Sequence, residues 1–78
     1  MASTRVLFLQ ANPAWEAIAA LGRFDEVRDD MIAAYEFMRD EYGPDYRFTQ
    51  GVLRALIRSF RLDEDEAAAA EYSAFLVK

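Results

Sequence analysis

The sequence predicts a mainly α fold, a small four-helix domain with a short N-terminal strand or extended arm. Three observations support this. Apolar residues recur at spacings of three and four along most of the chain, which is typical of helices that bury one face. Residues that start and stop helices divide these stretches into four segments. Apolar residues make up 54% of the 78 residues, which argues against disorder, and the length fits a single domain over residues 1–78.

The first elements are an extended segment and a short helix. Arg5–Gln10 is an apolar run rich in strand-forming residues, and its short length favours a strand. A strand needs a hydrogen-bonding partner, which is either Phe75–Val77 or the same run in a second subunit. Asn12 and the proline after it form a helix-start signal that predicts a helix over Pro13–Leu21. Gly22 suits the left-handed residue that ends this helix.

The second helix is expected to run from Glu26 to Tyr42, with Asp25 as its N-cap and Gly43-Pro44 as its stop. Its apolar stripe consists of Val27, Met31, Ala34, Tyr35, Met38 and Tyr42. Ile32 and Phe37 lie about 100° and about 120° to either side of this stripe. We therefore expect neighbours to contact this helix from more than one direction, as the central helix of the domain or as the seam of a dimer.

The third helix is predicted over Gln50–Phe60, after the loop Gly43–Phe48 and with Thr49 as its N-cap. Its apolar set is Val52, Leu53, Leu56, Ile57 and Phe60. The fourth helix opens with the capping-box pattern Asp63-x-x-Glu66, in which Asp63 is the cap, and runs through Ala67 to about Ala74. We expect the second and third helices to pack antiparallel through their apolar stripes.

Charge is sorted along the chain, which has a net charge of −5. Residues 47–61 hold four arginines and no acid. Residues 24–46 hold eight acids and two arginines, and residues 62–78 hold five acids and one lysine. Arg54, Arg58 and Arg61 follow one another at i, i+4 and i+7, so they form a basic row on the third helix. We expect this row to lie near acids of the second or fourth helix.

The absent residue types limit the chemistry. Without histidine or cysteine, the chain lacks the usual general base, a reactive thiol and the commonest transition-metal ligands, so we expect no enzymatic activity, no metal and no cofactor. The acids Asp63–Glu66 lack the ligand spacing of an EF-hand and are explained by helix capping. No apolar run is long enough for a secretory signal or a membrane span. We expect a cytoplasmic protein that does not bind membranes.

The first functional hypothesis is a non-enzymatic protein–protein interaction module, because the chain has more apolar side chains than so short a domain readily buries. We expect a homodimer that binds or inhibits another, unidentified protein. The expected interface residues are Leu7, Leu9, Phe37, Tyr42 and Tyr46. The other aromatic residues are expected in the core: Phe8, Trp15, Phe24, Tyr35, Phe48, Phe60 and Phe75.

Two alternatives stay open. In a helix-turn-helix regulator, the helix Gln50–Phe60 would face DNA with Thr49, Gln50 and the basic row. The long connection Gly43–Phe48, the flanking acids and the presence of a single lysine argue against this, and nucleic acid is not the expected partner. In an acidic nucleic-acid mimic, like the small inhibitors that phages make, the acidic surface would occupy a basic groove. Charge that merely keeps the protein soluble is the simpler explanation.

Overall fold

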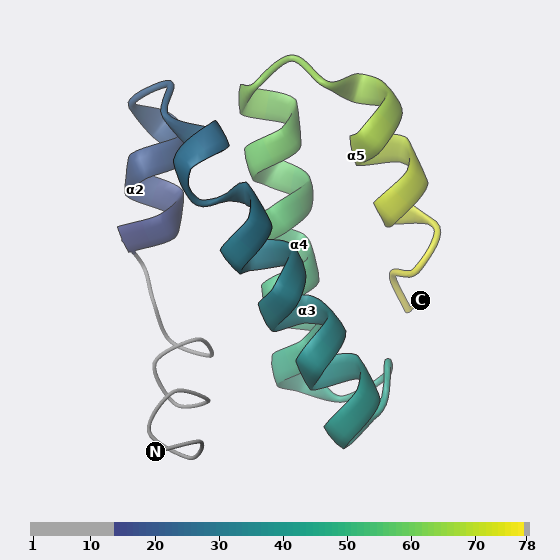
Figure 1. Cartoon of the computed structure of the whole chain (residues 1–78). Helices are drawn as coiled ribbons and strands as arrows, with labels where there is room; N and C mark the ends of the chain where they lie inside the picture. Colours follow the sequence, from purple (N-terminus) through teal and green to yellow (C-terminus); the bar gives the residue numbers. More distant parts are fainter. Residues whose placement is uncertain (1–13, 78) are drawn as a thin grey trace.

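The computed structural model describes residues 14–77 of the chain. This part contains four α-helices, α2 (Ala14–Ala20), α3 (Arg28–Tyr42), α4 (Arg47–Leu62) and α5 (Glu66–Ser73), and one 3-10 helix, η1 (Phe24–Glu26). The predicted mainly α, four-helix fold is confirmed (Figure 1). The described residues form no strand, and the predicted strand or arm at Arg5–Gln10 lies outside them.

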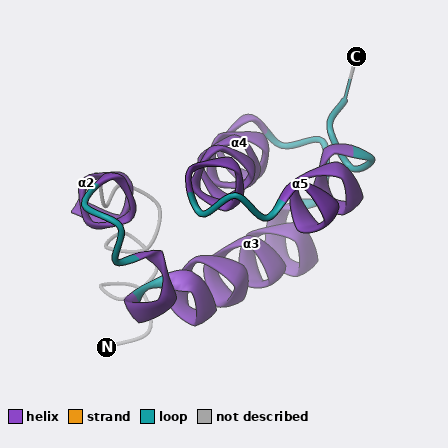
Figure 2. Cartoon of the chain, turned by 90° about the horizontal axis from the view of Figure 1, so that it is seen from above, coloured by secondary structure: helices purple, strands orange, loops and turns teal. Residues whose placement is uncertain are grey.

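The central helix is α4, and not the second helix of the sequence analysis. It packs against α2, α3 and α5. Figure 2 shows α4 between α2 and α5, with α3 below it in that view. The predicted antiparallel arrangement of α3 and α4 is confirmed in Figure 1. The buried residues of α4 occupy a broad arc that serves all three neighbours: Thr49, Gln50, Val52, Leu53, Leu56, Ile57, Ser59 and Phe60. The molecule is flat, with extents of 32 × 28 × 15 Å.

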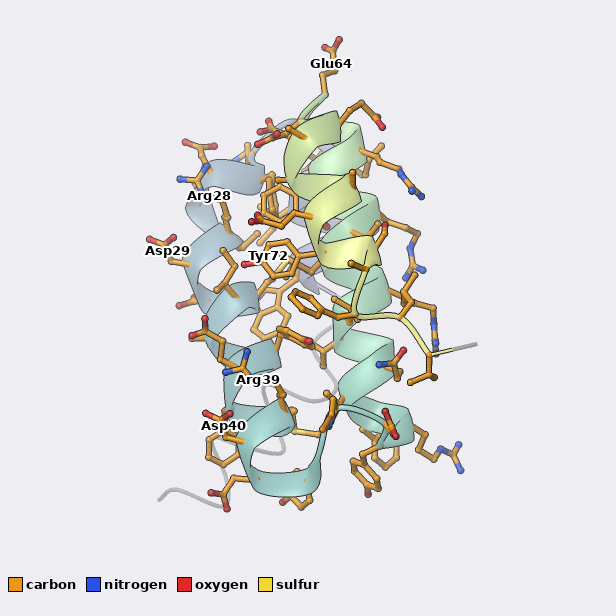
Figure 3. All side chains as sticks on the ribbon, turned by 90° about the vertical axis from the view of Figure 1, so that its right-hand side faces the viewer. Arg28, Asp29, Arg39, Asp40, Glu64 and Tyr72 are labelled. Atoms are coloured by element: carbon orange, nitrogen blue, oxygen red, sulfur yellow. The ribbon has the colours of Figure 1, made fainter. Side chains whose placement is uncertain are left out.

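Aromatic rings connect the elements through the core. Phe24 of η1 meets Phe60 of α4 edge to face, with ring centroids 5.0 Å apart. Phe60 in turn stacks on Tyr72 of α5 at 5.5 Å, and Tyr72 meets Tyr35 of α3 at 6.1 Å. Figure 3 shows the Tyr72 ring between α5 and α3. Each such pair adds about 0.5–1.5 kcal/mol beyond the area it buries, so these rings tie together helices that are distant in sequence.

Two predicted helix ends are confirmed by the glycines that follow them. Gly22 has φ of 80° and comes after α2, and Gly43 has φ of 94° and comes directly after α3. Residues other than glycine are strained at such φ angles, so a glycine in the sequence indicates where each of these two helices ends. Trp15, Phe24, Tyr35 and Phe60 are buried, as predicted. Phe48 and Phe75 were also expected in the core but are 45% and 50% exposed.

The predicted helix starts are less accurate than the ends. Asp25 does not cap α3, because it lies within η1, and the residue before α3 is Val27, which makes no side-chain cap. Asp63 does not cap α5 either, because Asp65 takes this role: its Oδ1 accepts a hydrogen bond of 3.1 Å from the Ala68 N–H. Any acid near a helix start has the chemistry of a cap, so a run of acids does not specify which one is used.

The predicted start of α4 is wrong by three residues. The helix begins at Arg47, preceded by Tyr46 in an extended conformation, and Thr49 lies inside it as a fully buried residue. The connection from α3 is therefore Gly43–Tyr46, which is shorter than predicted. As a consequence, Arg47 and Phe48 are helical residues whose positions are fixed by α4.

Candidate interaction surface

Three of the five predicted interface residues fall in the described part of the chain, and all three are exposed. Phe37 is 36% exposed, Tyr42 48% and Tyr46 38%. Leu7 and Leu9 lie outside the described residues. The structure separates the three that it describes: Phe37 is on the outer side of α3, whereas Tyr42 and Tyr46 lie at the turn between α3 and α4.

Tyr42 and Tyr46 form a continuous group of rings with Phe48, which we call the aromatic end. Tyr42 stacks on Tyr46 with ring centroids 5.2 Å apart, and Tyr46 meets Phe48 edge to face at 5.4 Å. The guanidinium of Arg47 lies over the Phe48 ring, 5.2 Å from its centroid. The rings hold one another in place and still leave between 38% and 48% of each residue exposed. A rigid, exposed aromatic group flanked by arginine is therefore present at this turn.

Gln50 fixes the backbone behind the aromatic end. It is only 3% exposed, and its Nε2 donates hydrogen bonds to the Pro44 carbonyl at 2.8 Å and to the Phe75 carbonyl at 3.2 Å. Its Oε1 accepts a hydrogen bond of 3.1 Å from the Val77 N–H. One buried amide thus joins α4, the turn before it and the C-terminal segment. These bonds limit motion of the turn that carries Tyr46.

Sequence reasoning missed the roles of Phe48 and Gln50, because it placed the start of the third helix too late. Once α4 begins at Arg47, helical spacing gives a clear signal for both. Gln50 lies three and seven residues before Leu53 and Ile57, so it belongs to the buried side. Phe48 lies five residues before Leu53, which is about 140° away around the helix axis, so it falls on the exposed side.

The basic row is longer than predicted. Arg47, Arg54, Arg58 and Arg61 are all exposed, lie within about 60° of one another around the axis of α4 and extend along about 21 Å of it. We call this row the arginine face. Thr49 and Gln50, which the helix-turn-helix hypothesis placed toward DNA, are buried and cannot reach a duplex. That part of the hypothesis is wrong.

Three ion pairs in the described part of the chain are local. They join Arg23 to Glu26 at 2.6 Å, Arg28 to Asp29 at 3.8 Å and Arg39 to Asp40 at 3.1 Å. Arg54 and Arg61 take part in none of the ion pairs within residues 14–77, so the pairing expected for these two with acids of other helices is not found there. These three pairs join residues one or three positions apart in sequence, so none of them links one α-helix to another.

Two tyrosines between α3 and α5 have perturbed acidity. Burial raises the pKa of Tyr35, which the nearby Arg39 opposes, with its guanidinium 5.7 Å from the ring centroid. Burial also raises the pKa of Tyr72, assisted by the negative charges of Glu36 and Glu71. Both phenols are therefore held in the neutral form at physiological pH, which suits a structural role.

No group of metal-binding side chains is found among residues 14–77. None of the helices in this range is both long enough and apolar enough to span a bilayer. Comparisons of the chain with protein-family models, with curated proteins and with solved structures found no match.

Proposed function

We propose that this chain is a non-enzymatic protein–protein interaction module that binds another protein through its aromatic end and also associates with itself. The observation that supports this is the group Tyr42, Tyr46 and Phe48, whose rings contact one another and stay 38–48% exposed. Exposed aromatic rings are costly in water unless a partner covers them. We place the protein in the cytoplasm as part of this proposal, because it has no cysteine.

The composition of the aromatic end fits protein recognition. Tyrosine, phenylalanine and arginine are enriched at protein interfaces, whereas lysine is depleted, and this chain has a single lysine. Aromatic side chains have few rotatable bonds, so little conformational entropy is lost when a partner covers them. The ring contacts and the Gln50 hydrogen bonds order the surface before binding. Such preordering strengthens binding because it lowers the entropic cost of association.

Removal of the aromatic end without damage to the core tests this proposal. We expect the double variant Tyr46→Ser, Phe48→Ser to lose the partner that tagged wild-type protein captures from a cell lysate. Central aromatic contacts at interfaces contribute about 2 kcal/mol or more, so the affinity should fall by about 30-fold or more. The matched control is Leu21→Ser with Leu62→Ser, because these residues are 73% and 59% exposed and lie outside the aromatic end. Capture that is equal in both variants would refute the proposal.

A DNA-binding regulator is the second candidate, and one observation favours it. The connection between α3 and α4 is Gly43–Tyr46, which has the length of a helix-turn-helix turn, and Arg47 extends the basic row. The net charge of −5 and the buried Thr49 oppose it. A gel shift with mixed genomic fragments at low salt decides the matter. Retention that disappears with Arg54→Ala and Arg61→Ala would establish DNA binding.

A further inference from the structure

The outer sides of α3 and α4 carry opposite charges. The arginine face of α4 holds Arg47, Arg54, Arg58 and Arg61, and no acid occurs between residues 47 and 62. The outer side of α3 holds five exposed acids, which we call the acidic face: Asp29, Asp30, Glu36, Asp40 and Glu41. Arg28 and Arg39 pair with Asp29 and Asp40, but five carboxylates outnumber two guanidinium groups. The chain therefore carries both halves of a charge-complementary contact.

The two faces point away from each other. The buried residues of α3, which include Met31 and Met38, face the core. Asp29, Glu36 and Asp40 lie on the opposite part of its circumference, and Asp30 and Glu41 lie at the edge of the buried side. Figure 3 shows Asp29 and Asp40 on the side of α3 that is turned away from α4 and α5. The arginines of α4 lie outside its buried arc, with Arg61 beside the edge of that arc. One molecule cannot bring its own two faces together, so their complementarity can be used only between copies.

The two faces also differ in the residues that lie between their charges. Phe37, 36% exposed, lies on the acidic face, with Asp40 and Glu41 three and four residues after it. On the arginine face, Gly51 follows Arg47 by four residues and precedes Arg54 by three, and a Cβ atom at Gly51 would meet nothing within 4 Å. The arginine face therefore has a position without a side chain among its arginines, and the acidic face has an aromatic ring beside its acids, so the two match in charge.

We propose that copies of this chain associate head to tail, with the arginine face of α4 in one copy against the acidic face of α3 in the next. This inference rests on the self-association in the proposed function but uses a surface that adjoins the aromatic end only at Arg47, whose guanidinium lies over the Phe48 ring. Arginine pairs with carboxylates through two parallel hydrogen bonds, which favours acidic side chains as its partners. Because the contact joins two different faces, each added copy leaves one face open, and the assembly can grow beyond a dimer.

The observations favour a second copy over nucleic acid as the occupant of the arginine face. A polyanion would meet a molecule of net charge −5 whose α4 offers no polar base-reading side chain at Thr49 or Gln50, since both are buried. A second copy offers carboxylates together with the Phe37 ring. Contacts between exposed charges are screened over about 10 Å at 0.1 M salt, so the association should be weak and sensitive to salt.

Sedimentation velocity of the full chain tests the inference, over rising protein concentration at low and at high salt. We expect the average mass to exceed that of a dimer at low salt, and the affinity to fall by about tenfold or more at high salt. Two variants each remove one face: Gly51→Glu with Arg54→Glu for the arginine face, and Phe37→Ser with Glu41→Ser for the acidic face. Each variant alone should be monomeric, with its helical circular dichroism retained.

A mixture of the two variants gives the decisive result. The intact arginine face of one variant and the intact acidic face of the other can form one contact, so the mixture should contain 1:1 pairs and nothing larger. A monomeric wild type, assembly by either variant alone, or a mixture that stays monomeric would overturn the inference. So would binding of a labelled DNA duplex to wild type that Gly51→Glu with Arg54→Glu abolishes, in the absence of self-association.

The failure of this inference is separable from that of the proposed function. The variant Tyr46→Ser, Phe48→Ser should assemble like wild type, because Tyr46 and Phe48 are not part of the contact and all four arginines of the arginine face remain. Loss of assembly in that variant would place self-association at the aromatic end and overturn the inference, yet leave the proposed function in place. Conversely, partner capture that depends on Tyr46 and Phe48 can be found even if the wild type is monomeric.

Discussion

Replacement of Gln50 by methionine should loosen the turn and the C-terminal segment together. Methionine has similar length and helix propensity, so the change removes the amide and little else. The wild-type amide makes hydrogen bonds of 2.8, 3.2 and 3.1 Å to Pro44, Phe75 and Val77. Each contributes about 0.5–1.5 kcal/mol net. Phe75 and Val77 are about half exposed, so water replaces part of the loss. We expect a net destabilisation of about 2 kcal/mol.

Two measurements check this expectation. Urea unfolding followed by circular dichroism gives the change in the free energy of unfolding, since a domain of this size is suited to two-state treatment. Amide hydrogen exchange by NMR should show the Val77 N–H exchanging about tenfold faster, because it loses its acceptor on Gln50. A destabilisation below about 0.5 kcal/mol, with the exchange of Val77 unchanged, would refute the reasoning.

The substitution Gln50→Glu adds a test by pH. A carboxylate at this position still accepts from Val77 but faces the Pro44 and Phe75 carbonyls without a proton to donate. Burial and the two carbonyl dipoles should raise its pKa above the unfolded value. The stability of the variant relative to wild type is then highest below the unfolded pKa and is lost as the pH rises through the folded pKa. Equal stability differences at acidic and neutral pH would contradict this.

Three further predictions concern the core and the caps. Thr49→Val should stabilise the domain by about 1 kcal/mol, because the buried Thr49 hydroxyl has no hydrogen-bond partner within the described residues; a lower melting temperature would contradict this. Asp65→Ala should destabilise the domain by about 1 kcal/mol, because it removes the helix cap of α5. The control Asp63→Ala should change the urea midpoint little. A larger loss of stability in Asp63→Ala than in Asp65→Ala would contradict the assignment of Asp65 as the cap. The pKa values of Tyr35 and Tyr72 are raised in the folded protein. The contribution of these tyrosines to the free energy of unfolding is therefore fully present below the pKa of the unfolded state and is lost as the pH rises through the pKa of the folded state. The urea midpoint should therefore fall above about pH 10, and a constant midpoint there would count against the assignment.

The presence of four helices and the ends of α2 and α3 were predictable from local chemistry, because Gly22 and Gly43 adopt backbone angles that favour glycine. The start of α4 was not, because no side chain caps it. Its position depends on contacts between distant segments, above all Gln50 with Phe75 and Val77. Propensity rules describe neighbours in sequence and cannot include such contacts.

The same limit explains why only part of the aromatic end was predicted from the sequence. Tyr42 and Tyr46 were expected at an interface from their place beside the Gly43 break, and the structure exposes both. Phe48 was assigned to the core because large apolar residues are usually buried. A sequence does not show which of several aromatic residues the small core has room for. The neighbours of α4 decide this, and they leave Phe48 outside.

Trp15 is the only tryptophan of the chain and is 7% exposed on α2, the helix at one side of the molecule. The described part of α2 packs against α4 and η1 and buries Trp15 there, so the indole ring stays in an apolar environment only while α2 is docked. Indole emission therefore reports the docking of this one helix, whereas far-ultraviolet ellipticity averages over all of them. Superimposed melting curves from the two signals would mean that α2 and the other helices unfold in a single cooperative transition. An indole transition at lower temperature than the ellipticity transition would mean that α2 undocks before the other helices unfold.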